Sequence, residues 1–98
     1  MALDLNPVYD QAMNNLANLL KARGHLEPAL TLLQNATSIR SNFAAAWMNL
    51  GIVYAELKRH DEAEESYKTA LLHRPKYPDC YYNLGNLVSR LESDTEYN

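Results

Sequence analysis

Residues 44–77 read AAAWMNLGIVYAELKRHDEAEESYKTALLHRPKY, and this stretch decides the fold. Its first part places Leu50 and Gly51 three and four residues after Trp47, and Tyr54 follows three residues later. Since an α-helix turns by about 100° per residue, these four side chains form one stripe of a helix. The second part carries an acidic run near its start, which complements the positive end of a helix, and Pro75 ends it. The stretch therefore predicts two helices joined by a short turn.

The same pattern returns along the whole chain. A shift of 34 residues brings the sequence into register with itself. A period of this length is typical of helical hairpins that bury their apolar faces on their neighbours. The coinciding positions include Met13 with Trp47 and Tyr81, Asn15 with Asn49 and Asn83, and Leu16 with Leu50 and Leu84.

The signature of residues 44–77 resembles the tetratricopeptide repeat (TPR), with tyrosine in place of phenylalanine at position 67. The residues that carry the resemblance, which we expect to form the repeat core, are Trp47, Leu50, Gly51, Tyr54, Ala63, Tyr67, Ala70 and Pro75. The resemblance implies an all-α solenoid of about five antiparallel helices in a right-handed superhelix segment. We expect helices near 8–22, 26–39, 44–57, 60–73 and 78–91.

These helices divide the chain into repeats. We expect the end of a preceding repeat at 1–9, full repeats at 10–43 and 44–77, the first helix of a third repeat at 78–91, and a frayed polar tail at 92–98. The repeats at both ends are then incomplete, and units of this kind bury their apolar faces on neighbours. We therefore expect self-association through one of the ends.

Composition excludes several classes of function. The chain has 98 residues, 47% hydrophobic and 21% charged, with a net charge of −3, which is ordinary for a globular chain and unlike a basic nucleic-acid binder. The lone Cys80 has no partner cysteine and no metal-type spacing around it. No run of about 18 apolar residues occurs. We expect no catalytic residue, cofactor or metal, no nucleic-acid partner, and no membrane contact by this segment itself.

Each first helix of a repeat also carries a polar stripe on the side away from its signature residues. In the TPR architecture this side lines the concave surface. An asparagine side chain offers both a donor and an acceptor, so it can pair with the N–H and C=O of an extended peptide. The same side chains could instead bond neighbouring helices to one another, and both interpretations stand. The candidate peptide-binding residues are Asn15, Asn18, Asn49, Ile52, Asn83 and Asn86.

The residues at certain positions of the first helices argue against one alternative kind of peptide-binding groove. TPR domains that clamp a terminal carboxylate use lysine and arginine from the first helices. The corresponding positions here hold Asn14, Asn18, Tyr82 and Asn86. Because the cations are missing, the sequence argues against a carboxylate clamp.

A single modification motif is present. Asn35-Ala36-Thr37 is an N-glycosylation sequon inside a predicted helix, beside the packing position Ala36. Glycosylation of Asn35 would require passage through the secretory pathway.

Residues between the signature positions support a narrower resemblance. The segments 42–53, 57–59 and 76–85 are similar to the TPR region of the transmembrane and TPR-containing O-mannosyltransferases, nearest the fourth member. That resemblance implies a luminal, non-catalytic arm of an endoplasmic reticulum membrane protein, which binds substrates of the cadherin type or other partners. The alternative is a cytosolic scaffold or co-chaperone-like adaptor that binds an extended peptide.

Overall fold

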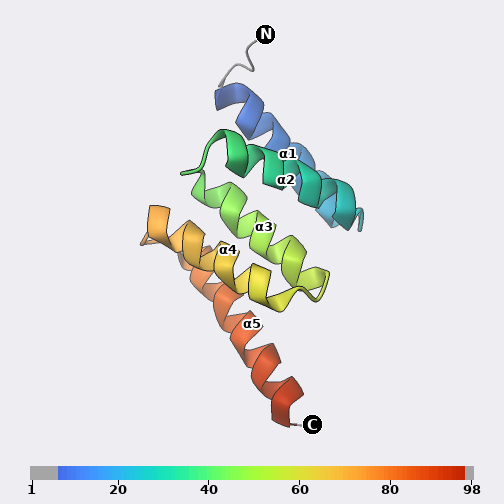
Figure 1. Cartoon of the computed structure of the whole chain (residues 1–98), viewed down its shortest axis with the longest axis vertical. Coiled ribbons are helices and arrows are strands. Elements are labelled where there is room, and N and C mark those ends of the chain that lie inside the picture. The colour runs from blue at the N-terminus through green and yellow to red at the C-terminus, as the bar shows by residue number, and fades with distance from the viewer. Residues whose placement is uncertain (1–6, 97–98) are drawn as a thin grey trace.

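The structure, a computed structural model, describes residues 7–96, and within that range it contains helices and no strand. Figure 1 shows the helices stacked in chain order, with α1 and α5 at opposite ends of the long axis. The predicted all-α architecture is confirmed. The helices are α1 (Pro7–Ala22), α2 (Leu26–Ile39), α3 (Ala44–Glu56), α4 (His60–His73) and α5 (Pro78–Glu96).

The last helix is longer than the sequence pattern predicts. It runs to Glu96, whereas we expected it to end near residue 91. No glycine or proline follows Gly85, so nothing in the sequence breaks the helix there. Residues 1–6, in the expected end of a preceding repeat, and residues 97–98, in the expected tail, lie outside the described residues.

Both hairpin turns have the same backbone geometry. Gly24 follows α1 with φ of 84°, and Lys58 follows α3 with φ of 66°. The next N–H in each case, of His25 or Arg59, donates to a carbonyl five residues back, at 2.8 Å. This hydrogen bond is the mark of the Schellman motif, which satisfies the last carbonyls of a helix. The first turn has the residue that suits a positive φ, and the second does not.

The core follows the repeat signature. Alanines of α4 let the helix approach α3 closely, and the ring of Tyr67 packs over Gly51. Trp47 is half-buried, and Pro75 is exposed in the turn after α4. The remaining predicted core residues are buried, namely Leu50, Gly51, Tyr54, Ala63, Tyr67 and Ala70.

The order of the helices determines where the candidate site lies in the stack. Helix α3 lies at the centre and contacts each of the other four helices. Since α1 and α5 both touch α3, the first helices of the repeats follow one another along one side of the stack. The polar stripes of α3 and α5 therefore meet on this side.

Candidate functional site

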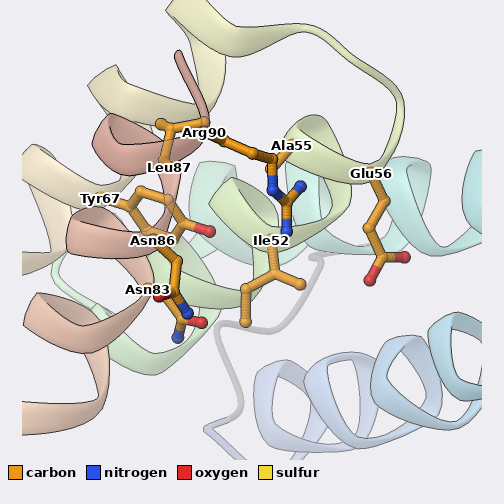
Figure 2. Close-up of a pocket in the computed structure, with 8 residues that line it drawn as sticks. All are labelled: Ile52, Ala55, Glu56, Tyr67, Asn83, Asn86, Leu87 and Arg90. Atoms are coloured by element: carbon orange, nitrogen blue, oxygen red, sulfur yellow. The ribbon is translucent and has the colours of Figure 1, made fainter. Parts of the chain in front are cut away.

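A recess of about 130 Å³ opens where α3, α4 and α5 meet, and we call it the groove recess (Figure 2). It brings together three of the predicted peptide-binding residues, Ile52 of α3 with Asn83 and Asn86 of α5. Its full lining is Ile52, Ala55, Glu56, Tyr67, Asn83, Asn86, Leu87 and Arg90.

Tyr67 connects the core to the groove recess. Its ring is held over Gly51, while its hydroxyl end lines the recess (Figure 2). Burial raises the pKa of Tyr67 to about 12, with a smaller raising effect from Cys80 and an opposing one from Arg90. The hydroxyl therefore stays protonated at neutral pH and can both donate and accept a hydrogen bond.

The groove recess also holds two opposite charges. In Figure 2 the side chain of Arg90 extends from α5 toward Ile52 and Ala55, and the carboxylate of Glu56 stands on the other side. Among residues 7–96, the ion pairs are Arg59–Glu62 and Lys68–Glu64, so Arg90 and Glu56 take part in neither. The groove recess thus contains a strong donor group and a strong acceptor group.

A third charge lies near the α1 side of Glu56. Burial lowers the pKa of Lys21, and the negative charge of Glu56 offsets part of that effect. The Glu56 carboxylate therefore interacts with a lysine of α1 as well as facing the recess.

The other candidate asparagines are placed differently. Asn49 is buried, and its amide nitrogen donates to Asn14 Oδ1 at 2.9 Å, which joins α3 to α1. Asn15 is exposed and accepts from Gln11 Nε2 at 3.3 Å. Asn18 is half-buried, and its Oδ1 accepts no hydrogen bond within residues 7–96. The hydrogen bond of Asn49 matches the helix-bridging interpretation, while the α5 asparagines are the ones that reach the recess.

Sequence reasoning missed part of the lining. The helical stripe that contains Asn83 and Asn86 also contains Arg90, and the stripe of Ile52 contains Glu56, so the spacing carried this signal. Tyr67 was assigned to the core because it belongs to the second helix of its repeat. Spacing within one helix does not reveal that the Tyr67 side chain reaches the recess between α3 and α5.

Cys80 lies in the core and does not line the groove recess. Cys80 is fully buried, its thiol donates to the Tyr67 carbonyl at 3.4 Å, and burial raises the pKa of the thiol to about 11. A thiol with this pKa stays protonated at neutral pH, so Cys80 contributes to the packing of the core. No cluster of metal-ligating side chains occurs within residues 7–96. None of the helices described has the length and apolar character needed to cross a membrane.

The sequon asparagine lies on α2 and does not line the groove recess. Asn35 is exposed on α2 and borders a shallow recess of about 290 Å³ beside Tyr9 and Met13. Thr37 of the sequon is buried, and its hydroxyl donates to the Leu33 carbonyl at 2.9 Å. The sequon is thus part of a formed helix.

Two matches to protein families cover the middle of the chain. Residues 44–77 match the family described as tetratricopeptide repeat, and residues 17–58 match the family described as TPR repeat. The first match spans the segment 44–77 whose pattern decides the fold.

Nearly the whole chain is similar to part of a longer protein. Human protein O-mannosyl-transferase TMTC3 is 32% identical over 109 aligned residues, which cover 97% of this chain and 12% of that protein. The chain thus spans about an eighth of the length of this relative. The resemblance to the O-mannosyltransferases is confirmed at the level of the family, through its third member.

Two solved structures share the architecture. YrrB, described as a TPR protein with an unusual peptide-binding site, has a TM-score of 0.75 and 32% identity, over 82% of this chain and 41% of its own. The first TPR of Spaghetti (RPAP3), bound to the HSP90 peptide SRMEEVD, has a TM-score of 0.81 over 89% of this chain and 69% of its own. At 17% identity, the second likeness concerns the fold alone.

Proposed function

Because this chain belongs to the tetratricopeptide-repeat proteins and is a protein–protein interaction module of that kind, we propose that it binds an extended segment of a partner protein in the groove recess. The observation that carries the proposal is the meeting of Asn83, Asn86 and Arg90 with Ile52 in one recess. The similarity to YrrB, a TPR protein with a peptide-binding site, supports it.

The chemistry of the groove recess suits a peptide backbone. An extended segment presents N–H and C=O groups in alternation, and the amides of Asn83 and Asn86 offer matching acceptors and donors. The Asn83 amide nitrogen also donates to the Asp79 carbonyl at 2.9 Å, which orients this side chain. Arg90 adds donors for a carbonyl or carboxylate, and Glu56 adds acceptors for N–H groups. Ile52 supplies an apolar surface beside them. Recognition of this kind depends on the backbone of the partner more than on its side chains.

The similarity to TMTC3 supports a wider setting for the proposed binding. The chain serves as the luminal substrate- or partner-binding arm of a membrane protein O-mannosyl-transferase in the endoplasmic reticulum, with cadherin-type substrates. In this proposal catalysis belongs to other parts of that protein, and this segment contributes its repeats. The competing role is that of a cytosolic adaptor for chaperone tails.

A titration separates the two roles. Overlapping peptides that tile a cadherin extracellular domain are titrated by calorimetry against the chain, alongside the peptide SRMEEVD. We expect binding by a cadherin-derived peptide and none by SRMEEVD, because the carboxylate-clamp positions hold Asn14, Asn18, Tyr82 and Asn86. Tight binding of SRMEEVD alone would reject the luminal arm and support the adaptor.

Variants locate the binding site. Asn86→Ala and Arg90→Ala should each weaken peptide binding by about tenfold, as expected for the loss of one or two hydrogen bonds. Asn15→Ala is the matched control, because Asn15 is an exposed asparagine on α1 that does not line the groove recess. Equal affinity in all three variants would place the peptide elsewhere.

A further inference from the structure

The groove recess is too small to enclose a stretch of peptide. Its volume is about 130 Å³, whereas a cleft that encloses a drug-sized ligand measures about 300–1,000 Å³. A bound segment therefore places one side chain inside the recess, while its backbone passes across the opening. The residues that line the recess then determine which side chain fits there.

Three hydrogen-bond donors without a protein partner face the groove recess. Within residues 7–96, the Arg90 guanidinium, the Tyr67 hydroxyl and the Asn86 amide form no hydrogen bond or ion pair. In Figure 2, Arg90 and Asn86 extend from α5, and the Tyr67 hydroxyl points out of α4 toward the same space. A guanidinium offers two parallel N–H groups that match a carboxylate, and the hydroxyl and the amide each add a donor. Together they suit an anionic group with several acceptor oxygens.

The negative charge of Glu56 does not cancel the positive charge of Arg90. Both residues line the groove recess, but they do not form an ion pair. Glu56 interacts instead with Lys21 of α1, where its charge offsets part of the lowering of the lysine pKa by burial. Two positive groups thus stand against one negative group, and Arg90 is the one left for a ligand.

We propose that the groove recess holds the carboxylate side chain of one aspartate or glutamate of the bound segment, between Arg90, Tyr67 and Asn86. This inference rests on the proposed function and adds a side-chain preference to its backbone recognition, so that the acidic residue fixes the register of the segment. A phosphorylated residue suits the recess less well. A phosphate carries a charge of about −1.5 to −2, which Glu56 on the other side of the recess repels more strongly than a carboxylate.

The probes are three libraries of short peptides that differ only in the central residue, which is glutamate, glutamine or lysine. The other positions hold uncharged residues and both ends are blocked, so the central side chain supplies the only charge. Fluorescence anisotropy at physiological ionic strength measures binding to the chain. We expect the glutamate library to bind about tenfold more tightly than the glutamine library, because it gains charge-assisted hydrogen bonds. The lysine library should bind most weakly.

Variants of the chain assign this preference to the groove recess. Arg90 is exposed, so its substitution leaves the fold intact. Arg90→Gln should bring the glutamate and glutamine libraries to nearly equal affinity, and Arg90→Glu should favour the lysine library over the glutamate library. Tyr67→Phe retains the ring over Gly51 and should reduce the preference for glutamate by about threefold. The matched control is Arg23→Gln, which removes the same charge from an exposed residue outside the recess and should retain the full preference.

The outcomes separate this inference from the proposed function. Equal affinity of the glutamate and glutamine libraries for the unchanged chain overturns the acidic preference but leaves peptide binding in place. An equal loss of preference in Arg23→Gln and Arg90→Gln would reveal a general attraction by the charge of the chain, and it also overturns the inference. The absence of binding by all three libraries overturns both the inference and the proposed peptide binding.

Discussion

The ring of Tyr67 covers Gly51 so closely that a Cβ at residue 51 would lie 2.6 Å from the ring atom Cε1. This contact joins α4 to α3 and fixes the direction of the Tyr67 side chain. The hydroxyl at the other end of that side chain lines the groove recess. The packing of the repeat core and the shape of the groove recess therefore depend on the same pair of residues.

Substitution of Gly51 by alanine tests this dependence. Overpacking at such a contact costs about 1–3 kcal/mol, and the better helix propensity of alanine returns up to about 1 kcal/mol. We expect Gly51→Ala to lower the free energy of unfolding by about 1 kcal/mol in urea denaturation followed by circular dichroism. The matched control is Gly85→Ala, which has open space around it and should raise the same quantity by up to about 1 kcal/mol. Changes of the same sign in both variants would contradict the proposed role of the contact.

Much of this architecture follows from the 34-residue period. Apolar spacing placed each of the five helices, and helical stripes placed Ile52, Asn83 and Asn86 on the surface that forms the groove recess. The contribution of Tyr67 and the pairing of Asn49 with Asn14 did not follow. Both depend on which neighbouring helix lies opposite, and the angles within one helix carry no information about that.

The buried amide pair between α1 and α3 is the subject of a second prediction. Asn14→Ala leaves the Asn49 amide buried without its acceptor, and such a loss costs about 1–3 kcal/mol. We expect Asn14→Ala and Asn49→Ala each to lower stability by this amount. In the double variant the loss should be less than additive, which a double-mutant cycle by urea denaturation would measure. Additive losses would mean that the two amides do not act as a pair.

The turn between α3 and α4 offers a stabilising change. Lys58 has φ of 66°, a conformation that costs a residue with a side chain about 1–2 kcal/mol, whereas the equivalent residue of the first repeat is Gly24. Lys58→Gly should therefore raise the free energy of unfolding by about 1 kcal/mol. The same change at Lys68, inside α4, should lower it by about 1 kcal/mol. Thermal unfolding measures both changes. If the midpoint temperature moved in the same direction in both variants, the turn conformation would not limit stability.

The raised pKa of the Cys80 thiol leads to a prediction of how stability changes at high pH. Burial raises the pKa of its thiol from the ordinary value of 9.0 to about 11 in the folded chain. Between these two values the unfolded chain loses the proton and the folded chain keeps it, so the folded state binds more protons. Stability linked to this thiol is therefore fully present below pH 9 and declines as the pH rises toward about 11.

Cys80→Ala should flatten the decline in urea midpoints between these pH values. The buried Tyr67, whose pKa is raised from 10.0 to about 12, would still contribute a decline at higher pH in both proteins. Identical pH profiles below pH 10 for the two proteins would mean that the thiol remains in contact with solvent in the folded chain.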